Sequence, residues 1–176
     1  MKNDMLKVKL NMITRGAMAL ALIFVFFTLF RGVTNILNAF LIPLTLYVCT
    51  INQKEKQIFT LYSAVIIFCL LFFKIQLFFI VFYCCIAFLL IKLREKKINT
   101  MLSALILTIT ISLSFWISII LTDNFFLTHM YDIIMRVFKG NTLAYAMMLI
   151  IEGALVGISQ LYISKMFYKR ILTIQE

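Results

Sequence analysis

Histidine and acidic residues are scarce in this sequence, which has one histidine and seven Asp or Glu among 176 residues. His129 is the only histidine that could activate a nucleophile. The Gly-x-Ser-x-Gly, His-Glu-x-x-His and P-loop patterns are all missing. No group of Cys and His has metal-ligand spacing. We therefore expect a protein that is not an enzyme and that has no cofactor and no metal site. Any ATP-driven process would need a partner.

Proline and glycine are scarce as well, with one and five residues, while apolar residues make up 64% of the chain. The mean hydropathy is +1.05. The long runs are apolar on every face, whereas the strands of a membrane barrel alternate apolar and polar residues. This composition predicts an all-α integral membrane protein, with residues 1–176 forming one transmembrane domain. The cysteines lie inside apolar runs and predict no disulfide framework; they are Cys49, Cys69, Cys84 and Cys85.

Six apolar runs are close in length to the roughly 20 helical residues that cross a bilayer, and the shortest of them fall slightly below it. They cover residues 12–30, 33–51, 58–73, 75–91, 101–121 and 142–164. Lys74 alone separates the third run from the fourth, which predicts a tight hairpin or, as the alternative, one broken unit. The hairpin is rich in Phe and has few polar groups, so we expect most of it to face lipid or to form scaffold surface.

The basic residues predict the orientation of these six spans. If the N-terminus is cytoplasmic, only Arg31, Lys74, Arg136 and Lys139 of the 17 Lys and Arg fall in outer segments. Cytoplasmic loops carry an excess of Lys and Arg, so both termini are expected in the cytoplasm of a multi-pass protein of the cell (plasma) membrane. The net charge of +10 then reflects orientation, and no nucleic-acid partner is expected.

Glu152 is the strongest candidate for a functional residue, because it lies near the middle of the last apolar run. A charge at that depth costs roughly 2.5–3.5 kcal/mol on insertion scales, and no Lys or Arg lies at the same depth in any run. We expect a carboxyl that is protonated or paired with a ligand. The alternative is a protonated carboxyl bonded to a neighbouring helix with only a structural role. The small residues Gly153 and Gly157 predict a close approach of that helix.

Four other residues are candidates for substrate binding. Asn35 and Asn38 share one face of the second run, and buried amides need partners, so they either bond another helix or line an outward-facing cavity. Trp116, the only tryptophan, either anchors the fifth helix at the membrane interface or walls a ligand cavity. Tyr145, like Met148, lies one to two turns outward of Glu152, on roughly the same face.

Two local patterns concern the first and second helices. Ala17 and Ala21 lie one turn apart, and small residues at this spacing let two helices pack closely in lipid. We expect them to contact a partner. In the second run Pro43 removes a backbone donor and predicts a kink.

The only long outer segment, residues 122–141, contains apolar side chains at three- and four-residue spacing. This pattern predicts a short amphipathic helix on the outer membrane surface, between the fifth and sixth spans. His129 and Asp132 are three residues apart within it, and we expect a surface pair.

Taken together, six short spans, two cytoplasmic ends and the sequence AMALA at residues 17–21 resemble the substrate-binding S components of energy-coupling factor (ECF) transporters. The resemblance covers the whole chain in architecture. It implies that residues 17–21 contact a membrane coupling subunit that works with ATPases. It also implies that the last helices hold a small molecule, usually a vitamin or a metal ion, on the outer side, with Trp116, Tyr145 and Glu152 in position to bind it. The His-rich N-terminus of the nickel and cobalt members is missing, so a metal substrate is not expected.

A fainter resemblance is to the small six-helix membrane subunit of the rod-shape elongation machinery, an interaction protein without a substrate. That family often has an Asp in a Gly-flanked position, which this chain lacks. A non-catalytic interaction, scaffold or accessory subunit of a larger complex stays open as the alternative to a transporter subunit. An unrecognised intramembrane enzyme is the more remote alternative.

Overall fold

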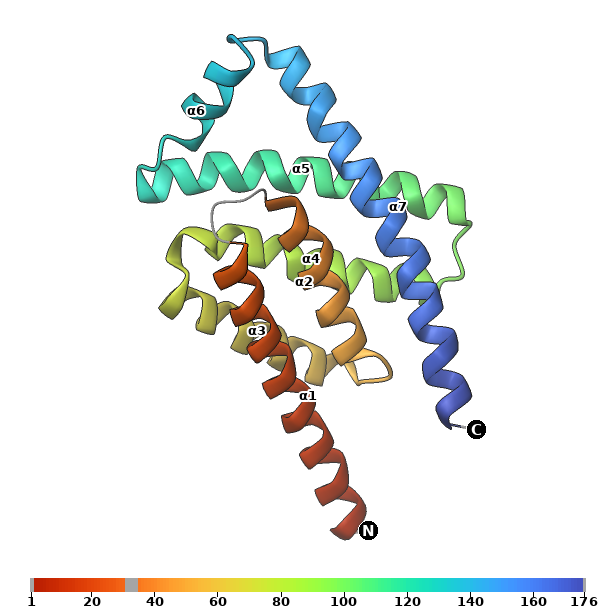
Figure 1. The fold of residues 1–176 in the computed structure, drawn as a ribbon. Helices are drawn as coiled ribbons and strands as arrows, with labels where there is room; N and C mark the ends of the chain where they lie inside the picture. The colour runs from red at the N-terminus through yellow and green to blue at the C-terminus, as the bar shows by residue number, and fades with distance from the viewer. Residues whose placement is uncertain (1, 31–34, 176) are drawn as a thin grey trace.

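The computed structural model describes the backbone of residues 2–30 and 35–175, and the side chains of residues 13–30 and 36–170. Every regular element in these ranges is helical (Figure 1). In chain order the elements are α1 (Lys2–Leu29), α2 (Asn35–Thr50), α3 (Glu55–Phe72), the 3-10 turn η1 (Lys74–Gln76), α4 (Leu77–Glu95), α5 (Thr100–Phe126), α6 (Met130–Val137) and α7 (Thr142–Gln175). Asparagine side chains cap two of them, because Asn99 accepts from the Met101 N–H and Asn141 accepts from the Ala144 N–H.

Within the described ranges, four helical segments are long and apolar enough to cross a membrane, and two shorter apolar helices accompany them. The four are Glu55–Phe72, Lys74–Glu95, Thr100–Phe126 and Thr142–Arg170, and the shorter two are Ile13–Leu29 and Ile36–Thr50. The predicted all-α class is confirmed, and the third and fourth runs form two helices joined by η1. Several helices are longer than the runs that predicted them, because the charged residues that end an apolar run are themselves good helix formers.

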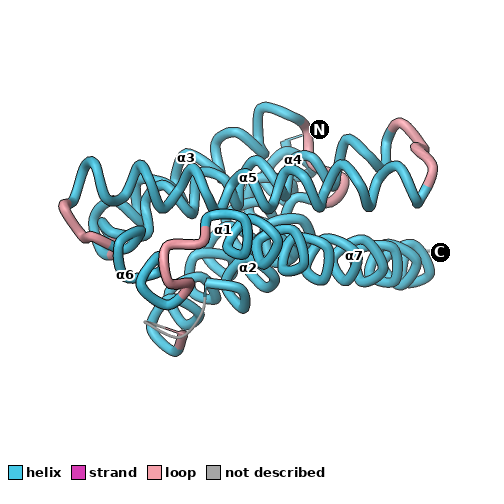
Figure 2. The backbone as a smooth tube through the Cα atoms, turned by 90° about the horizontal axis from the view of Figure 1, so that it is seen from above, coloured by secondary structure: helices cyan, strands magenta, loops and turns pink. Residues whose placement is uncertain are grey.

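The long helices form two layers of three that cross each other (Figures 1 and 2). One layer contains α3, α4 and α5 side by side, and the other contains α1, α2 and α7. Between the layers α1 packs on α3, α2 packs on α4, and α7 packs on α5. The contact between α5 and α7 is the most extensive in the described part of the chain.

The position of α4 corrects one expectation from the sequence. This helix lies between α3 and α5 and packs on α2, and its Ile80, Tyr83 and Ala87 are fully buried. We expected most of the hairpin to be surface, but only α3 has a largely exposed face, which includes Ile67 and Leu71. A helix that is apolar on every face has no periodic signal to distinguish a core environment from lipid.

Close contact between α5 and α7 depends on two glycines, as the sequence predicted. A Cβ atom on Gly153 would lie 2.7 Å from the Thr108 carbonyl oxygen and would overlap Ser112 Oγ, while one on Gly157 would lie 3.2 Å from Leu107 Cβ. Ser112 Oγ lies 2.8 Å from the Leu149 carbonyl oxygen across the crossing and 2.8 Å from the Thr108 carbonyl oxygen of its own helix, and it can donate its one hydrogen to either. The Gly-x-x-x-Gly pattern therefore acts within this chain, where it brings two backbones together.

Pro43 lies inside α2, and the helix continues through it. Proline has no N–H, so the Ala39 carbonyl, four residues earlier, loses its usual helical donor. Gln160 of α7 is fully buried and supplies the replacement, with Nε2 2.6 Å from the Ala39 oxygen. Neighbouring helices commonly satisfy backbone groups freed by proline in membrane proteins. This bond joins two residues that are 121 positions apart.

A double-mutant cycle tests this role of Gln160. Gln160→Leu is expected to lower the free energy of unfolding by about 1 kcal/mol, because a buried carbonyl loses its donor. In a Pro43→Ala background the restored N–H satisfies Ala39, so the same replacement is expected to cost less. Thermal unfolding of the four proteins in detergent gives the coupling energy. An equal cost of Gln160→Leu in both backgrounds would contradict the assignment.

The two ends of the bundle differ in charge. The first turn of α1, the last turns of α7, the α2–α3 turn and the α4–α5 turn lie at one end, whereas η1 and α6 lie toward the other (Figure 1). Most described basic residues belong to the first end: Lys54, Lys56, Lys92, Arg94, Lys96, Lys97, Lys165, Lys169 and Arg170. Lys74, Arg136 and Lys139 belong to the second.

Candidate functional site

An apolar pocket of about 330 Å³ lies at the end of the bundle that carries α6. Four helices and the residue after α6 form its walls. The lining residues are Ile36 of α2, Phe115 and Ile119 of α5, Ile134 and Val137 of α6 followed by Phe138, and Tyr145, Met148, Leu149 and Glu152 of α7. Small-molecule sites are typically concave, mainly apolar, equipped with a few polar groups and about 300–1,000 Å³ in volume. The pocket meets these criteria at the lower end of the size range.

The predicted amphipathic helix is present as α6, which packs against α5. Its Ile134 and Val137 line the pocket, so part of its apolar face covers the interior of the protein. His129 and Asp132 form the predicted surface pair, with Nδ1 and Oδ2 3.4 Å apart and both side chains exposed. We infer that α6 closes one side of the pocket.

Asp123 holds the corner between α5 and α6. Its carboxylate accepts from the backbone N–H groups of Met130 and Tyr131, each at 2.7 Å, and from the Thr128 hydroxyl. The first N–H groups of a helix lack partners within the helix, and a carboxylate is favourable at that positive end. Leu127 and His129 have positive φ angles of 53° and 55°. Asp123 thus stabilises a corner that costs backbone strain.

Tyr145 of α7 packs against the α6 segment from the other side. Its ring centroid lies 6.3 Å from that of Tyr131, in an edge-to-face arrangement, and 5.7 Å from that of Phe138. Aromatic pairs at these distances stabilise packing beyond the area that they bury. The position of α6 therefore depends on Asp123 at its start and on the Tyr145 ring along its length.

Glu152 is the only acidic or basic residue that lines this pocket, and its side chain is half-buried. Tyr145, Met148 and Glu152 follow each other at three- and four-residue spacing, which puts them on one face of α7. The adjacent Gly153 contacts α5 and keeps this part of α7 against the pocket wall. The common face of Glu152, Tyr145 and Met148 that the sequence predicts is confirmed.

Buried polar atoms without a hydrogen-bond partner occur near this end of the bundle. Among the described residues they include Asn38 Oδ1 on α2, Ser118 Oγ and Thr122 Oγ1 on α5, and Tyr145 Oη on α7. Buried polar atoms normally have partners, so each such atom requires an explanation. The Tyr145 hydroxyl is one of these enclosed atoms, although the Tyr145 side chain as a whole lines the pocket.

The structure places two other candidate residues, Asn38 and Trp116, outside the pocket that Glu152 and Tyr145 line. Asn38 is buried in α2 but is not among the residues that line the pocket. Trp116 is 47% exposed and lies outside the pocket, although its neighbour Phe115 is a lining residue. The side chain of Asn35 lies outside the described residues.

The sequence did not identify several of the pocket residues as ligand-binding candidates; they include Phe115, Ile119, Ile134, Val137 and Leu149. Phe115 and Ile119 are one turn apart on α5, a spacing that shows a shared face but not what the face contacts. Ile134 and Val137 were part of the amphipathic pattern, which predicted a membrane surface as their environment. Only the packing of α6 on α5 reveals that they line a pocket.

Among the described residues, no three His, Cys, Asp or Glu side chains form a group that could hold a metal ion. The four cysteines are free, as expected, and each lies within a helix. The polar chemistry available in the pocket is that of one carboxyl, Glu152, in apolar surroundings that include the Tyr145 ring.

No protein-family model, curated protein or solved structure matches this chain. The resemblance to ECF S components thus depends on the predicted span number, the expected orientation and the small residues at 17–21. The pocket chemistry is the independent basis for a function.

Proposed function

We propose that this chain is a membrane-embedded subunit that captures a small molecule in the α6 pocket, as the substrate-binding S component of an ECF-type uptake transporter does. The observation that carries the proposal is Glu152, one ionisable group in an otherwise apolar pocket of about 330 Å³ that α6 closes. A half-buried carboxyl without a described cation beside it favours a ligand that brings a positive charge or hydrogen-bond donors. The ligand class is therefore a small, mainly apolar molecule with an amine or a donor-rich group.

In this proposal the protein crosses the membrane six times with both termini in the cytoplasm. The four long apolar segments and the two shorter ones, Ile13–Leu29 and Ile36–Thr50, supply the spans. The basic α2–α3 and α4–α5 turns lie at the same end as the first turn of α1 and the last turns of α7, which agrees with the positive-inside rule (Figure 1). The α6 pocket then opens toward the outer side, where an uptake system meets its substrate.

Transport would depend on partner subunits, since the sequence contains no nucleotide-binding motif. Ala17 and Ala21 are exposed on α1, beside the exposed side chains of Met18 and Leu22. A face with small residues one turn apart permits close contact with a helix of another membrane protein. In the transporter proposal this partner is the membrane coupling subunit that acts with the ATPases.

A second candidate function is a non-catalytic interaction or accessory subunit of a larger membrane complex. The same exposed face of α1 favours it, because contact with a partner requires no ligand. The two candidates differ in what the α6 pocket contains: a small molecule in the transporter proposal and no exchangeable ligand in the accessory proposal.

Mass spectrometry of co-purified small molecules tests the proposal. Wild-type protein and Glu152→Gln, purified in parallel from the same cells, are denatured and the released molecules are quantified. We expect a molecule with an amine or a donor-rich group from wild-type protein, and at least about tenfold less from Glu152→Gln. A hydrogen bond to a charged group is worth about 1.5–3 kcal/mol, and each 1.4 kcal/mol corresponds to a factor of ten.

Glu95→Gln is the matched control, because Glu95 is an exposed carboxylate at the opposite end of the bundle. This variant should release the wild-type amount. Release of equal amounts by wild-type, Glu152→Gln and Glu152→Leu, or of no small molecule by any of them, would contradict ligand capture and leave the accessory subunit as the better candidate.

A further inference from the structure

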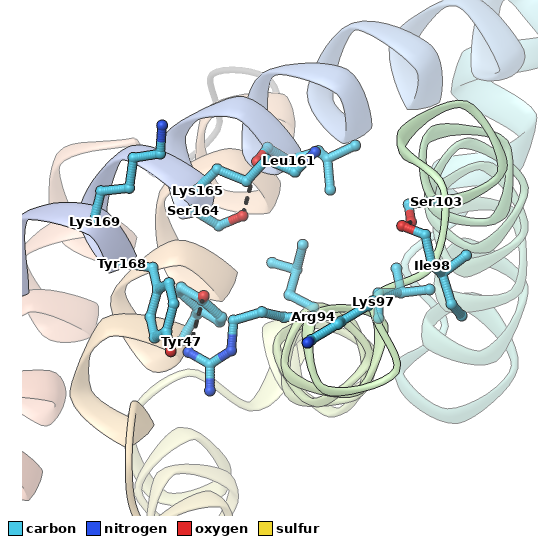
Figure 3. A pocket seen from close by; sticks show the side chains of 12 residues that line it. Tyr47, Arg94, Lys97, Ile98, Ser103, Leu161, Ser164, Lys165, Tyr168 and Lys169 are labelled. Carbon is cyan, nitrogen blue, oxygen red and sulfur yellow. Dashed lines mark hydrogen bonds between the residues drawn. The ribbon is translucent and has the colours of Figure 1, made fainter. Parts of the chain in front are cut away.

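Figure 3 shows a second pocket, of about 260 Å³. It lies at the opposite end of the bundle from α6. The ends of α4 and α7 form it together with Tyr47 of α2 and Ser103 of α5. Its lining includes four basic residues, Arg94, Lys97, Lys165 and Lys169. Residues about 70 positions apart in the sequence thus contribute positive charges to one cavity.

The described carboxylates near this pocket are engaged elsewhere. Glu95 and Glu55 both pair with Lys92, at 3.0 and 2.5 Å, and neither lines the pocket. Indeed no carboxylate is found among the lining residues. The like charges of Arg94, Lys97 and Lys165 repel one another, so a bound anion would stabilise this arrangement.

Arg94 is held in a defined position. Its guanidinium carbon lies 4.3 Å from the centre of the Tyr168 ring, and its Nη1 donates to the Tyr47 hydroxyl at 3.4 Å. Cation–π stacking fixes the plane of the guanidinium, whose five N–H donors match the geometry of a phosphate group. Most of these donors remain available, since the Tyr47 bond is the one side-chain hydrogen bond that the described residues give Arg94.

Lys97 contributes a positive charge from a backbone position whose conformation favours glycine. It follows the end of α4 with φ at +48°, and the Ile98 N–H closes the turn on the Leu93 carbonyl at 3.3 Å. Helices commonly end with Gly in this left-handed conformation, because a Cβ is strained there. The lysine therefore brings a cation to the pocket edge at a conformational cost. Lys165 on α7 is oriented by its bond to Thr100 Oγ1, at 2.7 Å.

Apolar side chains form the inner part of the pocket, among them Leu90, Leu93 and Leu161. The cations and this apolar wall lie side by side near the ends of two segments that are long enough to span a membrane, Lys74–Glu95 and Thr142–Arg170. Headgroups and the first part of the acyl chains occupy this level of a bilayer. Basic pockets between membrane helices are typical sites for anionic lipid headgroups.

We propose that this pocket binds an anionic phospholipid, with the phosphodiester at Arg94, Lys97 and Lys165 and the upper acyl chain along the leucines. The site goes beyond the proposed function and does not depend on Glu152. A free phosphate would satisfy the cations but would leave the apolar wall unused, so the lipid is the better fit.

Lipid binding to protein purified in detergent, followed by native mass spectrometry, tests the site. The probes are dioleoyl phosphatidylglycerol, which is anionic, dioleoyl phosphatidylcholine, which is zwitterionic, and inorganic phosphate. We expect wild-type protein to bind phosphatidylglycerol at least tenfold more tightly than phosphatidylcholine. Arg94→Gln should lower the phosphatidylglycerol affinity about tenfold, and Lys97→Gly about threefold to tenfold.

Lys139→Gly is the matched control, because Lys139 also has a positive φ, of 51°, but lies at the other end of the bundle. Both Lys-to-Gly changes remove one charge and relieve the same backbone strain, so both variants should fold. Equal affinities of wild-type protein for the two lipids would overturn the proposal, as would equal losses in Lys97→Gly and Lys139→Gly. Displacement of phosphatidylglycerol by millimolar inorganic phosphate would also overturn it, in favour of a free phosphate site.

Discussion

Gly153→Ala is expected to destabilise this protein by about 1–3 kcal/mol, the usual penalty for overpacking a well-packed interface. The added methyl group would lie 2.7 Å from the Thr108 carbonyl oxygen, which belongs to the backbone of α5 and cannot rotate away. The two helices must then separate, and the bond between Ser112 and the Leu149 carbonyl must lengthen. Thermal unfolding in detergent should show a midpoint lowered by several degrees.

Gly16→Ala provides the matched control for this prediction. Its Cβ would meet only Leu61 Cδ1, at 3.4 Å, which is an ordinary contact. Alanine also favours a helix over glycine by roughly 0.5–1 kcal/mol, so this variant should be as stable as wild type or more stable. Gly157→Ala should fall between the two, because its nearest contact is 3.2 Å. A Gly153→Ala protein that unfolds at the same temperature as Gly16→Ala would disprove the close crossing.

Asp123→Asn is expected to release α6 from the bundle. The change replaces one carboxylate oxygen by an NH₂ group, so at least one of the two backbone N–H bonds at the start of α6 is lost. Hydrogen bonds to charged groups contribute about 1.5–3 kcal/mol, and an eight-residue helix has little stability of its own. Hydrogen exchange of the α6 amides should accelerate by about tenfold or more.

Asp132→Asn tests whether any loss of negative charge in this segment has the same effect. Asp132 lies on α6 itself but is exposed and pairs only with the exposed His129 among described residues. Its replacement should leave the exchange of the α6 amides close to wild type. Equal acceleration in both variants would show that Asp123 has no special role at the corner.

Single-helix properties were predicted well from the sequence. The common face of Glu152, Tyr145 and Met148 follows from the helical repeat, and the amphipathic pattern of residues 122–141 predicted α6. The close approach at Gly153 and Gly157 was also predicted, because small residues remove the steric barrier between helices. Each of these features depends on spacing within one segment.

Contacts between distant segments were not predictable in the same way. The bond from Gln160 to the Ala39 carbonyl requires α2 and α7 to be neighbours, and neither residue type indicates its partner. Arg94 and Lys165 belong to two separate basic segments of the sequence, and the packing of α4 and α7 on the same two helices, α2 and α5, puts them in one pocket. Trp116 and Phe115 are adjacent in sequence, yet only Phe115 lines the α6 pocket.

The all-helical class was determined by the sequence alone, because apolar segments long enough to cross a membrane must satisfy their backbone hydrogen bonds internally, and the helix does this locally. The burial of α4 and the enclosure of the pocket by α6 were decided by the tertiary structure. A segment that is apolar on every face packs equally well against protein or lipid as far as hydrophobicity is concerned. The choice between them then depends on the fit of side chains at each crossing, and that fit exists only once the helices are assembled.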